Sequence, residues 1–268
     1  MAPTQVAQRP PRAPSLFWGI LATVTGGYLA ILGGLLGATA VYSSPASLWA
    51  TLHAPEIRHS ILLSLATCTV TALLSLLLAV PIGYLLARSD FRLRNWVSAL
   101  LDVPIVLPPM VIGLMLLIFF QTRVGRWIEF FLPLTYTVYG VVLAQLVIGS
   151  AFAIRTMHTT FENLSARPED VALTLGCSRA QAVWRVTLPA ARRGMFAAAT
   201  VAWARSLGEF GPILVFAGAT RMKTEVLPTT VWLELSVGNL EAAVAVSLLL
   251  VLFAVSILAL LRNLGERV

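Results

Sequence analysis

Uncharged apolar stretches recur along the chain at the length that a membrane-spanning helix needs. A helix crosses a hydrocarbon core of about 30 Å with about 20 apolar residues. Five stretches contain no charged side chain: residues 16–42, 60–87, 103–120, 134–154 and 242–261. A sixth stretch, residues 194–220, has the length but carries Arg205 and Glu209. Because backbone polar groups in lipid must be satisfied within each segment, the pattern predicts an all-α, polytopic membrane protein with about six transmembrane helices.

The amino-acid composition also indicates a protein that lies in a membrane. Apolar residues make up 58% of the 268 residues, charged residues 12%, and the mean hydropathy is +0.84. Soluble globular domains carry about 25% charged residues, so an ordinary soluble domain is excluded. The formal net charge is +7, and nearly all the basic residues are arginines. Membrane proteins gather arginine in cytoplasmic loops, so this charge does not by itself indicate nucleic-acid binding. Cys68 and Cys177 are too few for a disulfide framework, and we expect both as free thiols.

Basic residues gather on one side of the expected helices. With the N-terminus in the cytoplasm, 13 of them fall in cytoplasmic segments and 5 in the outer loops. The positive-inside rule then places both termini in the cytoplasm. We expect a flexible cytoplasmic tail at residues 1–15, and a transmembrane domain at residues 16–268 with a cytoplasmic loop at residues 155–194. The first apolar stretch also resembles a signal peptide, but it is about twice the usual 7 to 15 residues, which favours a retained helix.

The loop at residues 155–194 carries the signals of a helix followed by a tight turn. Pro168 suits the first position of a helix, and Glu169 and Asp170 complement the helix dipole in the first turn. Gly176 suits the left-handed residue that ends a helix. The sequence therefore predicts a first short helix that closes at Gly176.

A second short helix is expected to follow at once. Ser178 and Gln181, three residues apart, form a capping box, and Pro189 is expected to stop the helix after Leu188. A compact hairpin that projects from the membrane suits docking to a partner. Two other interpretations are a DNA-binding helix-turn-helix, which the membrane tethers on both sides disfavour, and a loop that only satisfies the positive-inside rule.

The same loop resembles the EAA motif of ABC-importer permeases, E-A-A-x3-G-x9-I-x-L-P. The matching positions are DVA at residues 170–172, Gly176, Val186 and LP at residues 188–189, with Asp, Val and Val replacing Glu, Ala and Ile. The resemblance implies a type I ABC-importer permease fold and a coupling helix at about residues 167–176 that enters a groove on a separate ATPase. The candidate coupling residues are Glu169, Asp170, Ala172, Gly176, Leu188 and Pro189.

The fifth expected span contains charges and helix breakers together. Arg205 and Glu209 are four residues apart and can pair on one helical face. Charges at membrane depth usually face protein or water and mark a pathway. The candidates for a pathway or gate are therefore Arg205, Glu209, Gly208, Gly211 and Pro212. An equally weighted alternative is that Arg205 and Glu209 form an ion pair that only holds two helices together.

Two further spans carry unusual residues. Pro104, Pro108 and Pro109 loosen the third expected span. Gln145 in the fourth is expected to form a hydrogen bond between helices.

Three other segments resemble the molybdate, tungstate and sulfate branch of the same permeases. They are SLGEFGP at residues 206–212, TEVLPT at residues 224–229 and DVPIVLPP at residues 102–109. The resemblance extends over about residues 60–261 and implies a permease for an oxyanion, molybdate or tungstate, in a bacterial inner membrane. Sulfate or another small anion, a gradient-driven secondary transporter and an intramembrane enzyme are the alternatives. The implied partners are an ATPase dimer, a second permease copy, an extracytoplasmic binding protein and the lipid bilayer.

The chain carries no nucleotide-binding motif of its own. The Walker A pattern ends in Gly-Lys followed by Ser or Thr, whereas the single lysine, Lys223, follows Met222. The histidines are scattered, so we expect no metal site. We also expect no cofactor, no nucleic-acid partner and no enzymatic activity. ATP hydrolysis is expected in a partner subunit.

Overall fold

The computed structural model describes residues 15–42 and 45–267, and within these ranges the regular structure is entirely helical. The chain falls into two compact units, Met1–Ser44 and Pro45–Val268. The first unit contains α1 (Ser15–Tyr42), a helix of 28 residues in which no described side chain is buried. The predicted tail at residues 1–15 lies almost entirely outside the described residues.

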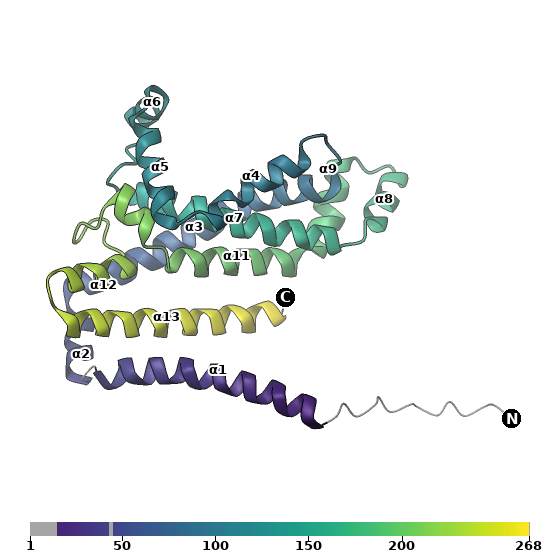
Figure 1. The fold of residues 1–268 in the computed structure, drawn as a ribbon. Coiled ribbons are helices and arrows are strands. Elements are labelled where there is room, and N and C mark those ends of the chain that lie inside the picture. The colour runs from purple at the N-terminus through teal and green to yellow at the C-terminus, as the bar shows by residue number, and fades with distance from the viewer. Residues whose placement is uncertain (1–14, 43–44, 268) are drawn as a thin grey trace. The chain divides into compact units, whose positions relative to one another are not determined.

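The second unit contains all the other elements and is drawn in Figure 1. Its helices are α2 (Pro45–His53), α3 (Pro55–Arg88), α4 (Arg94–Val106), α5 (Pro109–Gln121), α6 (Arg123–Phe131), α7 (Val138–Asn163), α8 (Arg167–Thr174), α9 (Arg179–Ala182), η1 (Val183–Thr187), α10 (Leu188–Ala190), α11 (Arg192–Leu207), η2 (Ile213–Ala217), α12 (Leu227–Ser236) and α13 (Leu240–Arg267). The elements η1 and η2 are π-helices.

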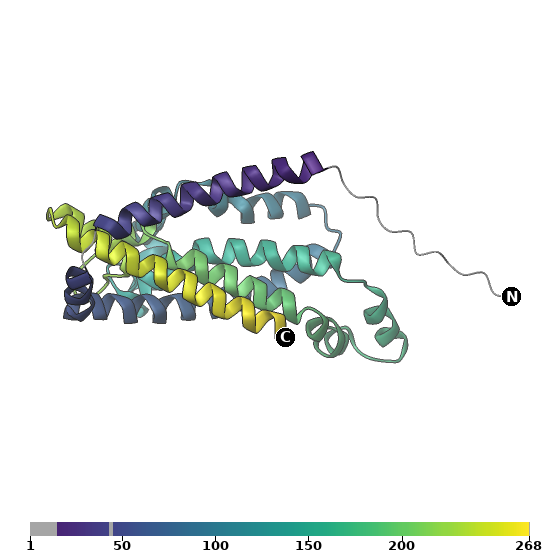
Figure 2. The ribbon, with the colours of Figure 1, turned by 90° about the horizontal axis from the view of Figure 1, so that it is seen from below.

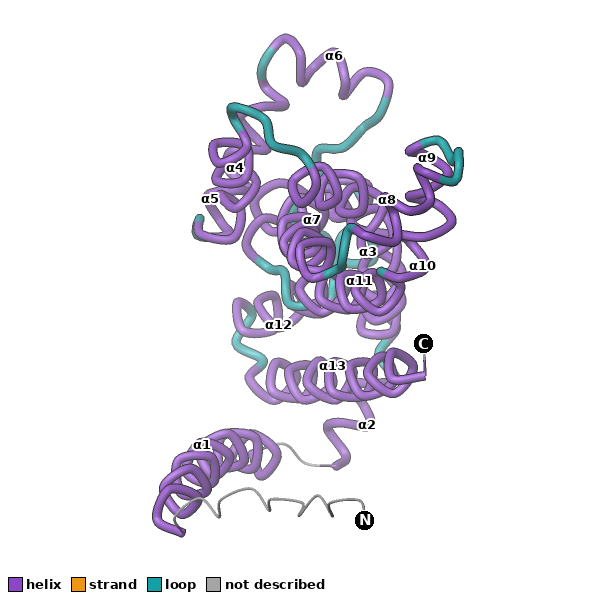
Figure 3. The backbone as a smooth tube through the Cα atoms, turned by 90° about the vertical axis from the view of Figure 1, so that its right-hand side faces the viewer, coloured by secondary structure: helices purple, strands orange, loops and turns teal. Residues whose placement is uncertain are grey.

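The centre of this unit is formed by α3, α7 and α11, which Figure 3 shows nearly end-on and close together. Small side chains line the contact, among them the fully buried alanines Ala79, Ala153, Ala198 and Ala202. Where α3 meets α7, a Cβ on Gly83 would lie 2.8 Å from the Met157 Cβ. Small residues let helices in a membrane approach closely, because packing rather than burial from water holds them together there. Figure 2 shows α11 running between α7 and α13.

Four helices among the described residues are long and apolar enough to cross a membrane: Phe17–Tyr42, Pro55–Arg88, Val138–Asn163 and Leu240–Ala259. The third predicted span is broken, since α4 and α5 are bent by 111° at the Leu107–Pro108 break. The fifth is broken too, because α11 has 16 residues and ends at Leu207. Pro108 and Pro109 lack the amide donor that would carry a helix through the first break, and Gly208 caps the end of α11. The all-helical membrane class is confirmed, but these two stretches are not single continuous helices.

Candidate functional site

The predicted helix-turn-helix lies between α7 and α11, at the end of the bundle opposite the α12–α13 turn (Figure 1). We call residues 164–191 the coupling hairpin. It is shorter than the predicted loop, because α7 continues to Asn163. Gly176 has a φ of +89°, and the amides of Gly176 and Cys177 donate to the carbonyls of Leu173 and Ala172. This is the Schellman arrangement, so the predicted left-handed end of the first helix is confirmed.

The second half of the coupling hairpin begins as predicted and continues differently. The Ser178 amide donates to the Gln181 Oε1 at 2.9 Å, and the Gln181 amide donates to the Ser178 Oγ at 3.3 Å, which confirms the capping box. The prediction that Pro189 stops this helix is wrong. The α-helical part ends at Ala182, the π-helix η1 follows, and the helical backbone continues through Pro189 in α10.

Glu169 holds the coupling hairpin against the membrane bundle. Its side chain is buried in α8, where it accepts a hydrogen bond from the Tyr84 hydroxyl of α3. Its second carboxylate oxygen accepts one from the Thr187 hydroxyl of η1 at 2.9 Å. Hydrogen bonds to an ionised acceptor are stronger than neutral ones. One carboxylate therefore joins three elements, namely α3, α8 and η1.

The other candidate coupling residues divide into an inner and an outer set. Ala172 is buried, and Leu188 is half-buried against the main hydrophobic core. Asp170, Gly176 and Pro189 are exposed.

Two apolar side chains accompany the exposed set, Val171 in α8 and Leu175 directly after the end of that helix. Val171 is 56% exposed and Leu175 is 80% exposed. The tip of the coupling hairpin thus presents an apolar surface beside the Asp170 carboxylate, supported from behind by the Glu169 contacts.

The predicted pair of charges in the fifth span is present. The Arg205 Nη1 lies 3.0 Å from the Glu209 Oε2, and Glu209 is 1% exposed. The Arg205 guanidinium also lies over the Phe152 ring of α7, 5.8 Å from its centroid. Glu209 does not lie within α11, since Gly208 is the residue that ends the helix. The pair therefore bridges the helix end and the segment that follows it.

The two broken spans meet at their breaks. A Cβ on Gly113 of α5 would lie 2.7 Å from the Pro212 Cα, and a Cβ on Gly211 would lie 3.0 Å from the Met110 amide nitrogen. Real Cβ atoms essentially never come within 3.0 Å of another atom, so the first contact excludes a side chain and the second is at the limit. The glycines therefore allow backbone to touch backbone where α5 crosses the start of η2. The sequence marked both breaks but gave no sign that they are in contact.

Gln145 forms the hydrogen bonds between helices that its place in the fourth span predicted. Its Nε2 donates to the Ser206 carbonyl of α11 at 3.2 Å. Its Oε1 accepts a hydrogen bond from the Thr71 hydroxyl of α3 at 3.2 Å. Since Gln145 is 1% exposed, it joins α3, α7 and α11 just before the break at Gly208.

The second unit is therefore a bundle of apolar helices with two broken members and a hairpin anchored at one end. Solved structures of a bacterial alginate ABC transporter share this fold. One of them matches at a TM-score of 0.72, with 15% identity over 94% of this chain and 95% of the other. Another, in complex with an alginate pentasaccharide-bound periplasmic protein, matches equally well over 94% of each chain.

The family model of the binding-protein-dependent transport system inner membrane component matches residues 79–268, and the chain belongs to this family. It is 36% identical over 236 residues to a probable molybdenum ABC transporter permease of Haloferax volcanii, covering 86% of this chain and 84% of the relative. It is 38% identical to the molybdenum transport system permease ModB of Mycobacterium tuberculosis, over 77% and 79% of the two chains. The sulfate permease CysT of Escherichia coli is 28% identical over 83% and 81%. The predicted all-helical permease fold and the family are confirmed, whereas the count of six spans is not, and the chain is a multi-pass inner-membrane transport subunit.

Proposed function

We propose that this chain forms the translocation pathway of an ATP-driven importer for molybdate or tungstate. The observation that carries the proposal is the 36–38% identity to permeases named for molybdenum, against 28% to a sulfate permease. A molybdate/tungstate permease of Pyrococcus abyssi, WtpB, is also 38% identical over 62% of this chain. Sulfate is therefore the less supported substrate.

The coupling hairpin is the proposed contact with a separate ATPase. Val171 and Leu175 expose apolar area that a partner surface can cover, and apolar area removed from water contributes about 25 cal/mol per Å². The Glu169 contacts make the hairpin a firm attachment, because they hold α8 to α3 and η1. Movement of the hairpin is thus transmitted to α3. Asp170, Gly176 and Pro189 border the contact, and Ala172 and Leu188 pack beneath it.

The crossing of α5 with η2 is the proposed gate. Arg205 and Glu209 fix the end of α11, and Gly208, Gly211 and Pro212 separate it from η2. A short helix that ends inside a membrane protein can tilt as a unit about such a break. ATP-driven movement of the hairpin shifts α11 from its cytoplasmic end and so changes the crossing.

The assembly contains three further partners in this proposal. A second permease copy supplies the other half of the pathway, an ATPase dimer binds the two hairpins, and an extracytoplasmic binding protein delivers the oxyanion. The solved alginate transporter in complex with its periplasmic protein supports the last of these. Both termini lie in the cytoplasm in this proposal, which the 13 to 5 distribution of basic residues supports.

The test is uptake by the reconstituted importer. The chain is combined in liposomes with its proposed ATPase and binding protein, and ATP-dependent accumulation of molybdate is measured with tungstate or sulfate as competitor. We expect accumulation that requires ATP and that tungstate suppresses far more strongly than sulfate. Equal suppression by sulfate would remove the molybdate assignment. Accumulation that follows an ion gradient without ATP would overturn the importer itself.

Glu209→Gln decides between the two interpretations of the charged pair. The variant keeps the shape of the side chain and removes its charge. If the pair belongs to the gate, transport changes while assembly with the ATPase is kept. If the pair is only structural, the yield of folded protein falls and the transport per folded molecule stays the same.

A further inference from the structure

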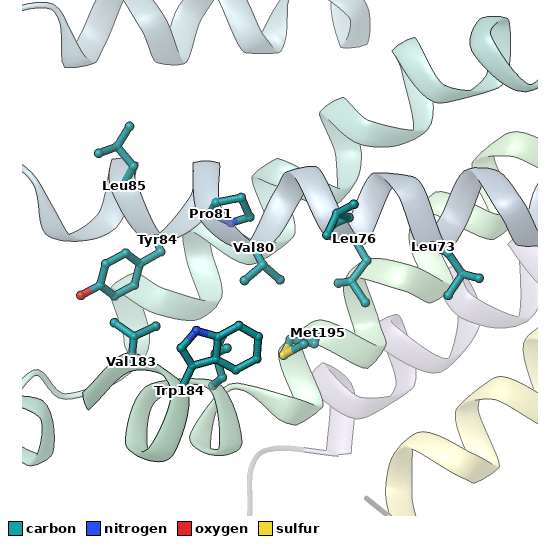
Figure 4. A pocket seen from close by; sticks show the side chains of 11 residues that line it. Leu73, Leu76, Val80, Pro81, Tyr84, Leu85, Val183, Trp184 and Met195 are labelled. Atoms are coloured by element: carbon teal, nitrogen blue, oxygen red, sulfur yellow. The ribbon is translucent and has the colours of Figure 1, made fainter. Parts of the chain in front are cut away.

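An apolar groove of about 640 Å³ lies along one side of α3, where the second half of the coupling hairpin and the start of α11 pass beside it. Figure 4 shows side chains of α3 on one wall and Val183, Trp184 and Met195 on the other. The main lining residues are Leu73, Leu77, Val80, Trp184, Leu188 and Met195. The groove is separate from the contact surface of α8 and from the crossing of α5 with η2.

The side chains that line the groove suit a hydrocarbon chain as ligand. Its lining side chains are aliphatic or aromatic, and the Tyr84 hydroxyl among them is already bound to Glu169. Trp184 is 73% exposed and Leu77 is 70% exposed within the second unit. Side chains of this size at membrane depth are covered by lipid or by another helix. Trp184 is also of the type that gathers where the hydrocarbon meets the headgroups.

The length of the groove corresponds to one leaflet. Its α3 wall extends from Leu73 to Leu85, and twelve residues of α-helix rise about 18 Å. Half of a hydrocarbon core of about 30 Å is about 15 Å. A single acyl chain that begins near Leu85 therefore ends near Leu73, at the middle of the membrane.

The charges beside the groove suit an anionic headgroup. Residues 171–204 contain four arginines and no acidic residue. Three of them, Arg185, Arg192 and Arg193, are exposed and alternate in sequence with the lining residues Trp184, Leu188 and Met195. Clustered arginines at the cytoplasmic membrane surface attract anionic lipids, and a guanidinium can bind phosphate through two hydrogen bonds.

We propose that the groove binds one acyl chain of an anionic phospholipid from the inner leaflet, with its phosphate at Arg185, Arg192 and Arg193. This rests on the cytoplasmic side proposed above for the coupling hairpin. The lipid fills the space between α3 and η1, the same two elements that Glu169 joins. It therefore stabilises the seated position of the hairpin, and a change in the inner-leaflet headgroup alters the coupling without altering the ATPase contact.

Native mass spectrometry of the purified chain tests the proposal. The protein is extracted in mild detergent, exposed to equal amounts of phosphatidylglycerol and phosphatidylcholine, and the retained lipids are counted per chain. Val80→Trp fills the groove, and Leu62→Trp, on an exposed position of α3 outside it, is the matched control. We expect the wild type and L62W to retain phosphatidylglycerol and V80W to lose at least nine-tenths of it. Equal retention in V80W and L62W overturns the proposal.

Two further results complete the test. Arg185→Gln with Arg192→Gln is expected to abolish the preference for phosphatidylglycerol while acyl-chain retention persists, whereas an unchanged preference contradicts the headgroup site. If V80W instead splits a permease dimer with no change in bound lipid, the groove belongs to a second copy and the proposal fails.

Tryptophan fluorescence tests lipid binding without the V80W variant, so its result does not depend on whether that variant folds. Trp184 emission, taken as the difference between wild type and Trp184→Phe, is expected to be quenched by phosphatidylglycerol brominated in its acyl chain. The absence of quenching contradicts the proposal. ATPase co-purification is recorded in parallel. Its loss in the wild type contradicts the proposed docking and leaves the lipid result standing.

Discussion

Replacement of Glu169 should release the coupling hairpin while the membrane bundle stays folded. The Glu169 carboxylate is buried and accepts hydroxyl hydrogen bonds from Tyr84 and Thr187. In Glu169→Ala both hydroxyls lose their partner. A hydrogen bond to a charged group contributes about 1.5–3 kcal/mol, and the hydroxyls recover part of this by turning toward other acceptors. We therefore expect the hairpin to lose about 3 kcal/mol of local stability.

Amide hydrogen exchange of α8 is the assay. Since about 1.4 kcal/mol corresponds to a factor of ten, a loss of about 3 kcal/mol accelerates exchange in α8 about 100-fold. Exchange in α3 and α7 should stay unchanged. Asp170→Asn is the matched control, because it neutralises the neighbouring carboxylate at an exposed position of the same helix. Tyr84→Phe removes one of the two hydrogen bonds and should give an intermediate acceleration.

A double-mutant cycle of Tyr84→Phe with Glu169→Ala separates this contact from general damage. If the contact is direct, the combined variant loses less stability than the sum of the two single losses, by at least about 0.5 kcal/mol. Additive losses, or α8 exchange in Glu169→Ala no faster than in Asp170→Asn, would refute the anchoring role.

Three further predictions address the contact surface, the gate and the outer loop. Leu175→Asp places a charge on the exposed tip of the hairpin and should weaken co-purification of the ATPase at least tenfold, about 1.4 kcal/mol, with helix content unchanged by circular dichroism. Gly113→Leu cannot fit against Pro212, so uptake should stop, whereas Leu114→Ala, an exposed neighbour, should transport normally in the same uptake assay. Burial raises the pKa of Glu225, a fully buried carboxylate, so folded stability falls as pH rises from below the ordinary value of 4.5 toward the raised one. Glu225→Gln should abolish that pH dependence and raise the melting temperature at about pH 7; an unchanged profile contradicts this account.

Features that depend on neighbouring residues in the chain were predictable from the sequence. The left-handed end at Gly176, the capping box at Ser178 and the pairing of Arg205 with Glu209 each involve residues within five positions of one another, and all three are present. Backbone geometry and side-chain chemistry decide such features, because helix ends leave polar groups that a nearby residue must satisfy.

Contacts between distant residues were not predictable from one sequence. Tyr84 and Glu169 are 85 positions apart, and nothing near Tyr84 in the sequence distinguishes it from an interfacial aromatic residue. Glu169 and Asp170 were both candidate coupling residues, and α8 turns Glu169 inward while Asp170 is exposed. A helix of eight residues is too short for hydrophobic periodicity to fix which of two adjacent acids faces the bundle.

The two π-helices lie beside prolines, and the sequence did not predict how the backbone continues at these places. The wider turn of η1 ends two residues before Pro189, where the sequence indicates a stop, and that of η2 begins after Pro212, where it indicates a bend. A wider turn changes the direction of every side chain that follows, and π-turns are frequent at functional sites. Trp184 lies in η1 and lines the groove, while η2 begins directly after Pro212, which touches α5. Both proposed moving parts of the molecule therefore contain a π-turn beside a proline, which is where a helix can shift its register at the cost of few hydrogen bonds.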